Sequence, residues 1–214
     1  MLMILTKIFI NMICPRFFKS DTSKSYTWLL PAILTIVLFI SCSNNRLAKD
    51  AEQFMGQKIT ISSDLNAVWN GKDTVLTDFT KAPAKLVVWT DSLGCTSCRA
   101  SKMSEWNSII VYADSIAQWF NIIFLFTPKK EDIDRVNIAL KADKFDYPVF
   151  VDQNANFVKQ NPKLPKNRQL HSFLLDKNNK VVMVGSPLYN PALWALYKTT
   201  IQRMMDNSGV LPEQ

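Results

Sequence analysis

Two cysteines, Cys95 and Cys98, follow an apolar run and begin a segment with helical spacing. Thiols separated by two residues in the first turn of a helix are close enough to form a disulfide, so the pair can alternate between dithiol and disulfide. The free N–H groups and positive dipole at the start of a helix stabilise a thiolate on the first cysteine. We therefore expect Cys95 to attack a partner disulfide and the more shielded Cys98 to resolve the mixed disulfide. Arg99 and Lys102 would add to the positive field around Cys95.

Other roles remain open for this pair. In a secreted protein two close cysteines can form a static disulfide, or half of a metal site. The only histidine is His171, and there is no second Cys-x-x-Cys. If His171 lies near Cys95, it would lower the pKa of that thiol through an ion pair, or complete a copper site with both thiols. The simpler alternative is a strand-edge histidine bonded to backbone or solvent. We expect no cofactor.

Residues 1–42 have the features of a signal peptide. Residues 28–40 form an almost uninterrupted apolar stretch that leads into Ser41 and Cys42. A stretch of about 13 residues is short for a transmembrane helix, which needs roughly 20. A small residue before a cysteine is typical of a processing site. The run from Leu38 to Cys42 resembles a bacterial lipobox, although Phe39 replaces the usual leucine.

This resemblance implies that Cys42 is lipidated and becomes the mature N-terminus. An uncleaved signal anchor is the alternative. Either leader would attach the domain to a membrane outside the cytoplasm, so we expect a lipid-anchored protein of the cell envelope that faces the periplasm. Cys14 would leave with the leader, and every free thiol of the folded domain would then belong to Cys95 and Cys98.

Composition limits the number of domains and the classes of partner. The chain has 214 residues, of which 48% are hydrophobic, enough for one domain with a core after removal of the leader. The net charge is +7, and residues 1–42 contribute four basic residues and one acidic residue, leaving +4 for the remainder. Lysine and arginine are spread without a basic run, so we expect no nucleic-acid partner.

Hydrophobic patterning predicts alternating strands and helices. Residues 58–61 and 74–79 are β-prone runs separated by a turn signal at residues 70–73, and they predict an N-terminal hairpin or two added strands. The remaining expected elements are strands over 86–90, 121–126 and 147–151, helices over 95–120 and 130–145, a loop over 154–168, a hairpin of 172–176 with 181–185, and a last helix that begins at Pro191. This order predicts an α/β fold with a mixed central sheet. The tryptophans are expected to be core residues: Trp89, Trp106, Trp119 and Trp194.

The order of elements resembles the thioredoxin-like superfamily, and in particular its envelope-anchored thiol-disulfide oxidoreductases with redoxin-like domains. The resemblance depends on Cys95-Thr96-Ser97-Cys98 after a buried strand and on Phe173-Leu174-Leu175-Asp176 in the late hairpin. It implies a three-layer sandwich over residues 57–207, in which helices flank a mixed sheet with an N-terminal β extension. Residues 43–56 would be a polar tether and residues 208–214 a tail.

By this resemblance, the chain would be a membrane-anchored oxidoreductase in which Cys95 attacks protein disulfides, Cys98 resolves them and an unidentified donor supplies electrons. The family usually places a cis-proline before the late hairpin, whereas this sequence has Leu170, His171 and Ser172 there. The tryptophan that commonly precedes the first cysteine is also missing. The alternatives are a non-catalytic thioredoxin-like binding module with a structural disulfide, and a copper-handling protein, although copper-delivery relatives use a longer cysteine spacing.

Overall fold

The computed structural model describes residues 46–212, apart from residues 63, 64, 75, 77, 78, 94 and 144. The predicted leader and the lipidation site Cys42 lie outside the described residues. Within the described part, no helix is long and apolar enough to cross a membrane.

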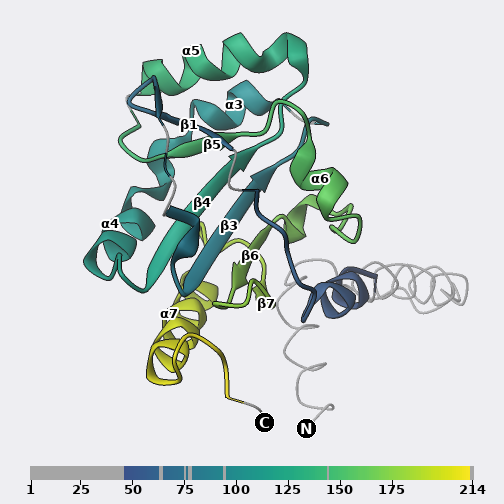
Figure 1. The fold of residues 1–214 in the computed structure, drawn as a ribbon, viewed down its shortest axis with the longest axis vertical. Coiled ribbons are helices and arrows are strands. Elements are labelled where there is room, and N and C mark those ends of the chain that lie inside the picture. The colour runs from purple at the N-terminus through teal and green to yellow at the C-terminus, as the bar shows by residue number, and fades with distance from the viewer. Residues whose placement is uncertain are drawn as a thin grey trace, which may run out of the picture. The chain divides into compact units, whose positions relative to one another are not determined.

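A mixed sheet is the centre of the fold (Figure 1). Its strands are β1 (Asn66–Trp69), β2 (Lys72–Thr74), β3 (Ala84–Thr90), β4 (Phe120–Phe126), β5 (Val149–Val151), β6 (Ser172–Leu175) and β7 (Val181–Val184). The strand order is β2-β1-β5-β4-β3-β6-β7. β4 lies parallel to β3 and β5, whereas β6 pairs antiparallel with β3 and with β7. The late hairpin is therefore present as predicted.

Helices cover both faces of the sheet. They are a helix over residues 46–54, α3 (Thr96–Ala100), α4 (Asn107–Ser115), α5 (Ile133–Asp143), α6 (Asn156–Gln160) and α7 (Pro191–Asp206), with 3-10 turns η2 (Phe79–Lys81), η3 (Met103–Trp106), η4 (Lys130–Asp132) and η5 (Arg168–Leu170). Strand side chains alternate between faces. In β4, Phe124 packs with the cluster that includes α4, α5 and α7, while Ile123 and Leu125 pack with α6 and helix 46–54. Figure 1 shows α4 and α6 on opposite sides of the sheet, which confirms the predicted three-layer arrangement of a mixed sheet between helices.

The N-terminal β extension is present, but its strands differ from the prediction. β1 and β2 pair in a register that sets Trp69 opposite Lys72, so Asn70 and Gly71 alone form the turn. Both turn residues have positive φ, 51° and 69°, as a tight hairpin requires. Because the turn has only two residues, the paired strands must end at Trp69 and begin at Lys72. The strands therefore lie at residues 66–69 and 72–74. Of the predicted range 58–61, Lys58 makes only an isolated bridge with Lys180. Of the predicted range 74–79, Thr74 ends β2 and Phe79 begins η2, and residues 75, 77 and 78 lie outside the described residues.

The helix predicted over residues 95–120 is divided into α3, η3 and α4. The Ser101 hydroxyl donates a hydrogen bond to the Cys98 carbonyl oxygen (3.1 Å), and Lys102 leaves the helical region with φ −125°. Serine side chains that bond nearby backbone groups compete with helix formation. The break leaves Met103 and Trp106 of η3 buried against the sheet.

The structure describes residues 46–56 of the predicted polar tether, which spans residues 43–56. Residues 46–54 are helical, and Phe54 is buried with its ring edge-on to Phe173 at a centroid distance of 5.0 Å. Gly56 N–H donates to the Val181 carbonyl oxygen (2.8 Å). Residues 46–56 therefore belong to the folded domain, because Phe54, an aromatic residue within a polar segment, packs into the core between the sheet and α6.

The loop predicted over residues 154–168 contains α6 and the start of η5. The Asp152 carboxylate accepts hydrogen bonds from the N–H groups of Asn156 (3.0 Å) and Phe157 (2.8 Å), two of the groups that a helix leaves free at its start. Phe157 is buried beneath this turn. Capping and one aromatic contact are thus enough to form a helix ahead of Pro162.

A lysine is buried at the start of β3. Lys85 is 2% exposed, and its ammonium donates to the carbonyl oxygens of Ala82 (2.7 Å) and Asp176 (3.1 Å). Burial lowers the pKa of Lys85 to about 8, opposed by the negative charge of Asp176. Lys85 lies at the opposite end of β3 from the cysteines, so this polar contact stabilises the base of the sheet and not the redox pair.

Candidate functional site

Cys95 and Cys98 form a disulfide at the start of α3, after the carboxyl end of β3, with their Cα atoms 5.2 Å apart. Cys95 is the N-cap residue, and its Sγ accepts a hydrogen bond from the Cys98 N–H (3.2 Å). A hydrogen bond to the charged form lowers the pKa of a thiol, so this N–H favours a thiolate on Cys95 after reduction. Both cysteines are exposed in the oxidised pair.

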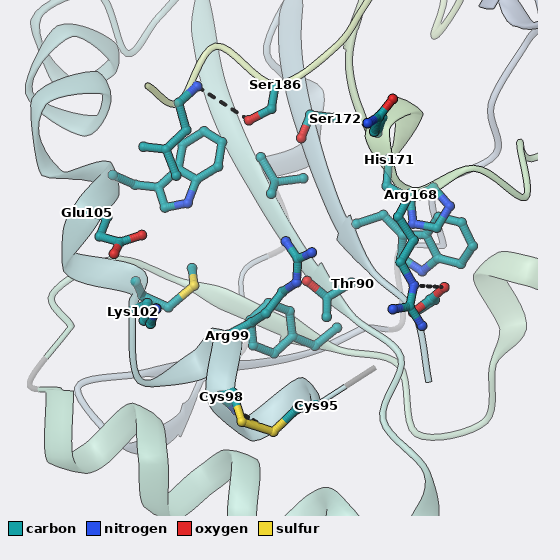
Figure 2. A pocket seen from close by; sticks show the side chains of 18 residues that line it. Thr90, Cys95, Cys98, Arg99, Lys102, Glu105, Arg168, His171, Ser172 and Ser186 are labelled. Atoms are coloured by element: carbon teal, nitrogen blue, oxygen red, sulfur yellow. Dashed lines mark hydrogen bonds and ion pairs between the residues drawn. A yellow bond between two sulfur atoms is a disulfide. The ribbon is translucent and has the colours of Figure 1, made fainter. Parts of the chain in front are cut away.

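A cavity of about 520 Å³ opens beside the disulfide (Figure 2). Both cysteines line it, together with residues from the carboxyl ends of β3 and β4 and from the chain before β6. Most of its apolar wall comes from large side chains: Val88, Trp89, Met103, Trp106, Phe126 and Leu188. A partner disulfide that approaches Cys95 would therefore meet a largely preformed apolar surface.

Arg99 and Lys102 both line this cavity. Figure 2 shows the Arg99 guanidinium pointing away from the two sulfur atoms, although the side chain starts one residue after Cys98. The predicted effect of Arg99 on the Cys95 thiolate is therefore weak in this arrangement. Its positive charge faces whatever occupies the cavity.

An ion pair that the sequence did not predict lies at the cavity wall. Arg168 Nε donates to Asp91 Oδ2 at 3.1 Å, and Asp91 Oδ1 accepts a hydrogen bond from the Leu93 N–H (3.2 Å). Asp91 thus orders the chain between β3 and Cys95 and ties it to η5. The hydrogen bond from the Leu93 N–H is a local feature, because aspartate side chains often accept from the backbone two residues further on. No local pattern predicts that Arg168 is the ion-pair partner of Asp91.

His171 is buried, and it is the residue before β6. Its Nε2 bonds to the Pro165 carbonyl oxygen (2.9 Å), and its ring stacks on Trp89 at a centroid distance of 4.1 Å. Figure 2 places His171 on the opposite side of the cavity from the cysteines. The structure does not bring it to Cys95, and the described residues contain no group of three His, Cys, Asp or Glu side chains able to hold a metal ion.

We expect His171 to titrate below the usual histidine range. Burial lowers its pKa from 6.5, and the Pro165 hydrogen bond opposes this shift only in part. The unfolded chain therefore binds a proton more readily, and the free energy of unfolding should fall as the pH drops below about 6.5. NMR titration of this single imidazole, with denaturation from pH 7 to 5, measures both effects. His171→Phe keeps a ring on Trp89 and should weaken the pH dependence; a pKa at or above 6.5 would contradict the prediction.

The backbone before β6 has no cis peptide, and none occurs elsewhere in the described residues. The Trp89 N–H donates to the His171 carbonyl oxygen (2.9 Å), so His171 continues the antiparallel contact between β3 and β6. Ser172 follows on the cavity wall.

No model of a known protein family matches the sequence, and no curated protein is similar to it. Among solved structures, an uncharacterized conserved protein from Geobacillus kaustophilus is 11% identical, with 75% of this chain and 86% of that chain covered and a TM-score of 0.48. A thioredoxin-like protein in the oxidized form is 14% identical (72% and 97% covered, TM-score 0.42). The thioredoxin domain of a thiol-disulfide oxidoreductase from Bacteroides vulgatus is 18% identical (64% and 98% covered, TM-score 0.36).

Proposed function

We propose that this chain is a thiol-disulfide oxidoreductase that acts on protein disulfides through Cys95 and Cys98. The observation that carries the proposal is an exposed disulfide at the start of a helix, directly beside a cavity. A purely structural disulfide would add little here, because Cys95 and Cys98 are only three residues apart and the stabilisation that a disulfide gives is smallest for short loops. An exposed pair with a hydrogen-bonded first sulfur has the access and thiolate stabilisation that exchange requires.

The exchange proceeds in two steps from the reduced pair. The Cys95 thiolate attacks one sulfur of the substrate disulfide, a mixed disulfide forms, and the other substrate sulfur leaves as a thiolate that takes up a proton. The Cys98 thiolate then attacks Cys95 Sγ, reforms the Cys95–Cys98 disulfide and releases the second substrate thiolate. Two electrons pass to the substrate, and an external dithiol restores the pair by the same exchange in reverse.

We further propose that the domain is held by a lipid on Cys42 in the cell envelope, facing the periplasm. The support is the apolar stretch of residues 28–40 followed by the lipobox-like run that ends at Cys42. An oxidising compartment suits a dithiol that depends on a supply of electrons.

Trapping of mixed disulfides tests the proposed exchange. Cys98→Ala keeps the attacking thiol and removes the resolving one, so Cys95 should remain bound to its substrates when cells are quenched with acid and thiols are alkylated. The Cys95→Ala, Cys98→Ala double variant is the matched control and should trap nothing. A wild-type pair that stays fully oxidised, together with no trapped partner, would instead identify a structural disulfide.

A further inference from the structure

The charged side chains around the cavity are not balanced. Five of the described residues that line it are charged: Asp91, Arg99, Lys102, Glu105 and Arg168. Asp91 and Arg168 neutralise each other in their ion pair. Glu105 accepts a hydrogen bond from Tyr189, whose pKa is raised as a result. In the described part of the chain, Arg99 and Lys102 have no hydrogen-bond or ion-pair partner for their side chains, so the cavity carries a net positive charge.

Apolar surface continues beyond the cavity on two of its borders. Leu93 lies between Asp91 and Cys95 and is 81% exposed, and Tyr189 follows Leu188 and is 77% exposed. Large side chains exposed next to an apolar cavity are typical of surfaces that contact a polypeptide. A small thiol compound could fill the cavity but would not reach both borders.

We propose that this cavity selects disulfide-bonded polypeptides that carry an acidic side chain next to the reacting cysteine. Arg99 and Lys102 would bind the carboxylate, while Leu93 and Tyr189 contact the flanking residues of the same segment. Arginine presents paired N–H donors that match a carboxylate, and the apolar cavity wall strengthens such a pair relative to bulk water. The inference rests on the proposed exchange at Cys95, since it names the substrate class of that reaction.

Two matched peptides test this selectivity. Each holds one disulfide, and they differ only in two residues beside the attacked cysteine, which are Glu in one and Gln in the other. With the reduced full chain at low salt, kcat/KM for the Glu peptide should exceed that for the Gln peptide by about tenfold. The difference should arise mainly in KM and disappear near 0.5 M salt, because screening at that ionic strength is strong over a few ångströms.

Variants connect the preference to the two cations. Arg99→Gln and Lys102→Gln should each lower the ratio of kcat/KM for the Glu peptide to kcat/KM for the Gln peptide about threefold. The double variant should reduce both peptides at the same rate. Lys130→Gln is the matched control, because Lys130 is exposed on η4 and does not line the cavity. Its ratio should equal that of the unaltered chain.

The other outcomes separate the two proposals. Equal rates for both peptides, with no effect of either variant, would overturn the inference and leave the proposed exchange intact. Rapid reduction of glutathione disulfide, at the rate of the Glu peptide, would overturn the requirement for a polypeptide. Failure to reduce any disulfide by a chain whose pair is demonstrably reduced would overturn the proposed function and this inference with it.

Discussion

Replacement of Cys95 with serine should abolish disulfide reduction. A serine hydroxyl is almost fully protonated at neutral pH, and its oxygen does not attack a disulfide sulfur as a thiolate does, so we expect the rate to fall by about a thousandfold or more. The fold should be retained, because Cys95 is exposed and its main structural role is to cap a five-residue helix. Turnover of insulin disulfides with a dithiol donor measures the loss, and circular dichroism verifies the fold.

Ser97→Ala is the matched control for this substitution. The Ser97 Oγ lies 3.6 Å from Cys95 Sγ, so its removal alters the surroundings of the thiol without removing the nucleophile. We expect the rate to change by no more than about tenfold, the value of one hydrogen bond. If Cys95→Ser retained substantial turnover, the attacking group would have to be elsewhere and the proposed exchange would be wrong.

The central sheet could be predicted from the sequence because its strands are continuous apolar runs. Such runs occur where both faces of a strand are buried, as in β3 and β4. The prediction began β3 two residues late, because Lys85 is charged and lysine is almost never fully buried without partners. Its partners are the carbonyl oxygens of Ala82, three residues away, and of Asp176, 91 residues away, and no sequence pattern near Lys85 predicts the second of these contacts.

The helix over residues 46–54 and the wall of the cavity could not be predicted, because both depend on contacts between residues that are far apart in the sequence. Phe54 is one aromatic residue in a polar segment, and its burial depends on Phe173 in β6. Within the site, the spacing of the cysteines alone predicted the disulfide. The Asp91–Arg168 pair joins residues 77 apart, and the direction of the Arg99 side chain depends on the cavity that it enters.

The largest loss of stability should follow Phe124→Ala. Phe124 is fully buried at the centre of β4, and its ring lies 5.4 Å from Trp106, 5.6 Å from Phe145 and 5.8 Å from Tyr147 in edge-to-face contacts. Removal of a buried ring leaves a cavity, so we expect the free energy of unfolding to fall by about 3–5 kcal/mol. Guanidinium denaturation with the disulfide intact measures the change.

The control for this substitution is Val111→Ala on the outer face of α4, where Val111 is 69% exposed and a change within about 0.5 kcal/mol is expected. Phe124→Leu separates the contribution of buried apolar area from that of the ring contacts, because leucine restores part of the area but none of the contacts between rings. A loss below about 1 kcal/mol for Phe124→Ala would mean that the core closes around the missing ring. Trp106, which also lines the cavity beside Cys95, would then have to move, and reduction of the Glu peptide by the folded variant would reveal that shift through a higher KM.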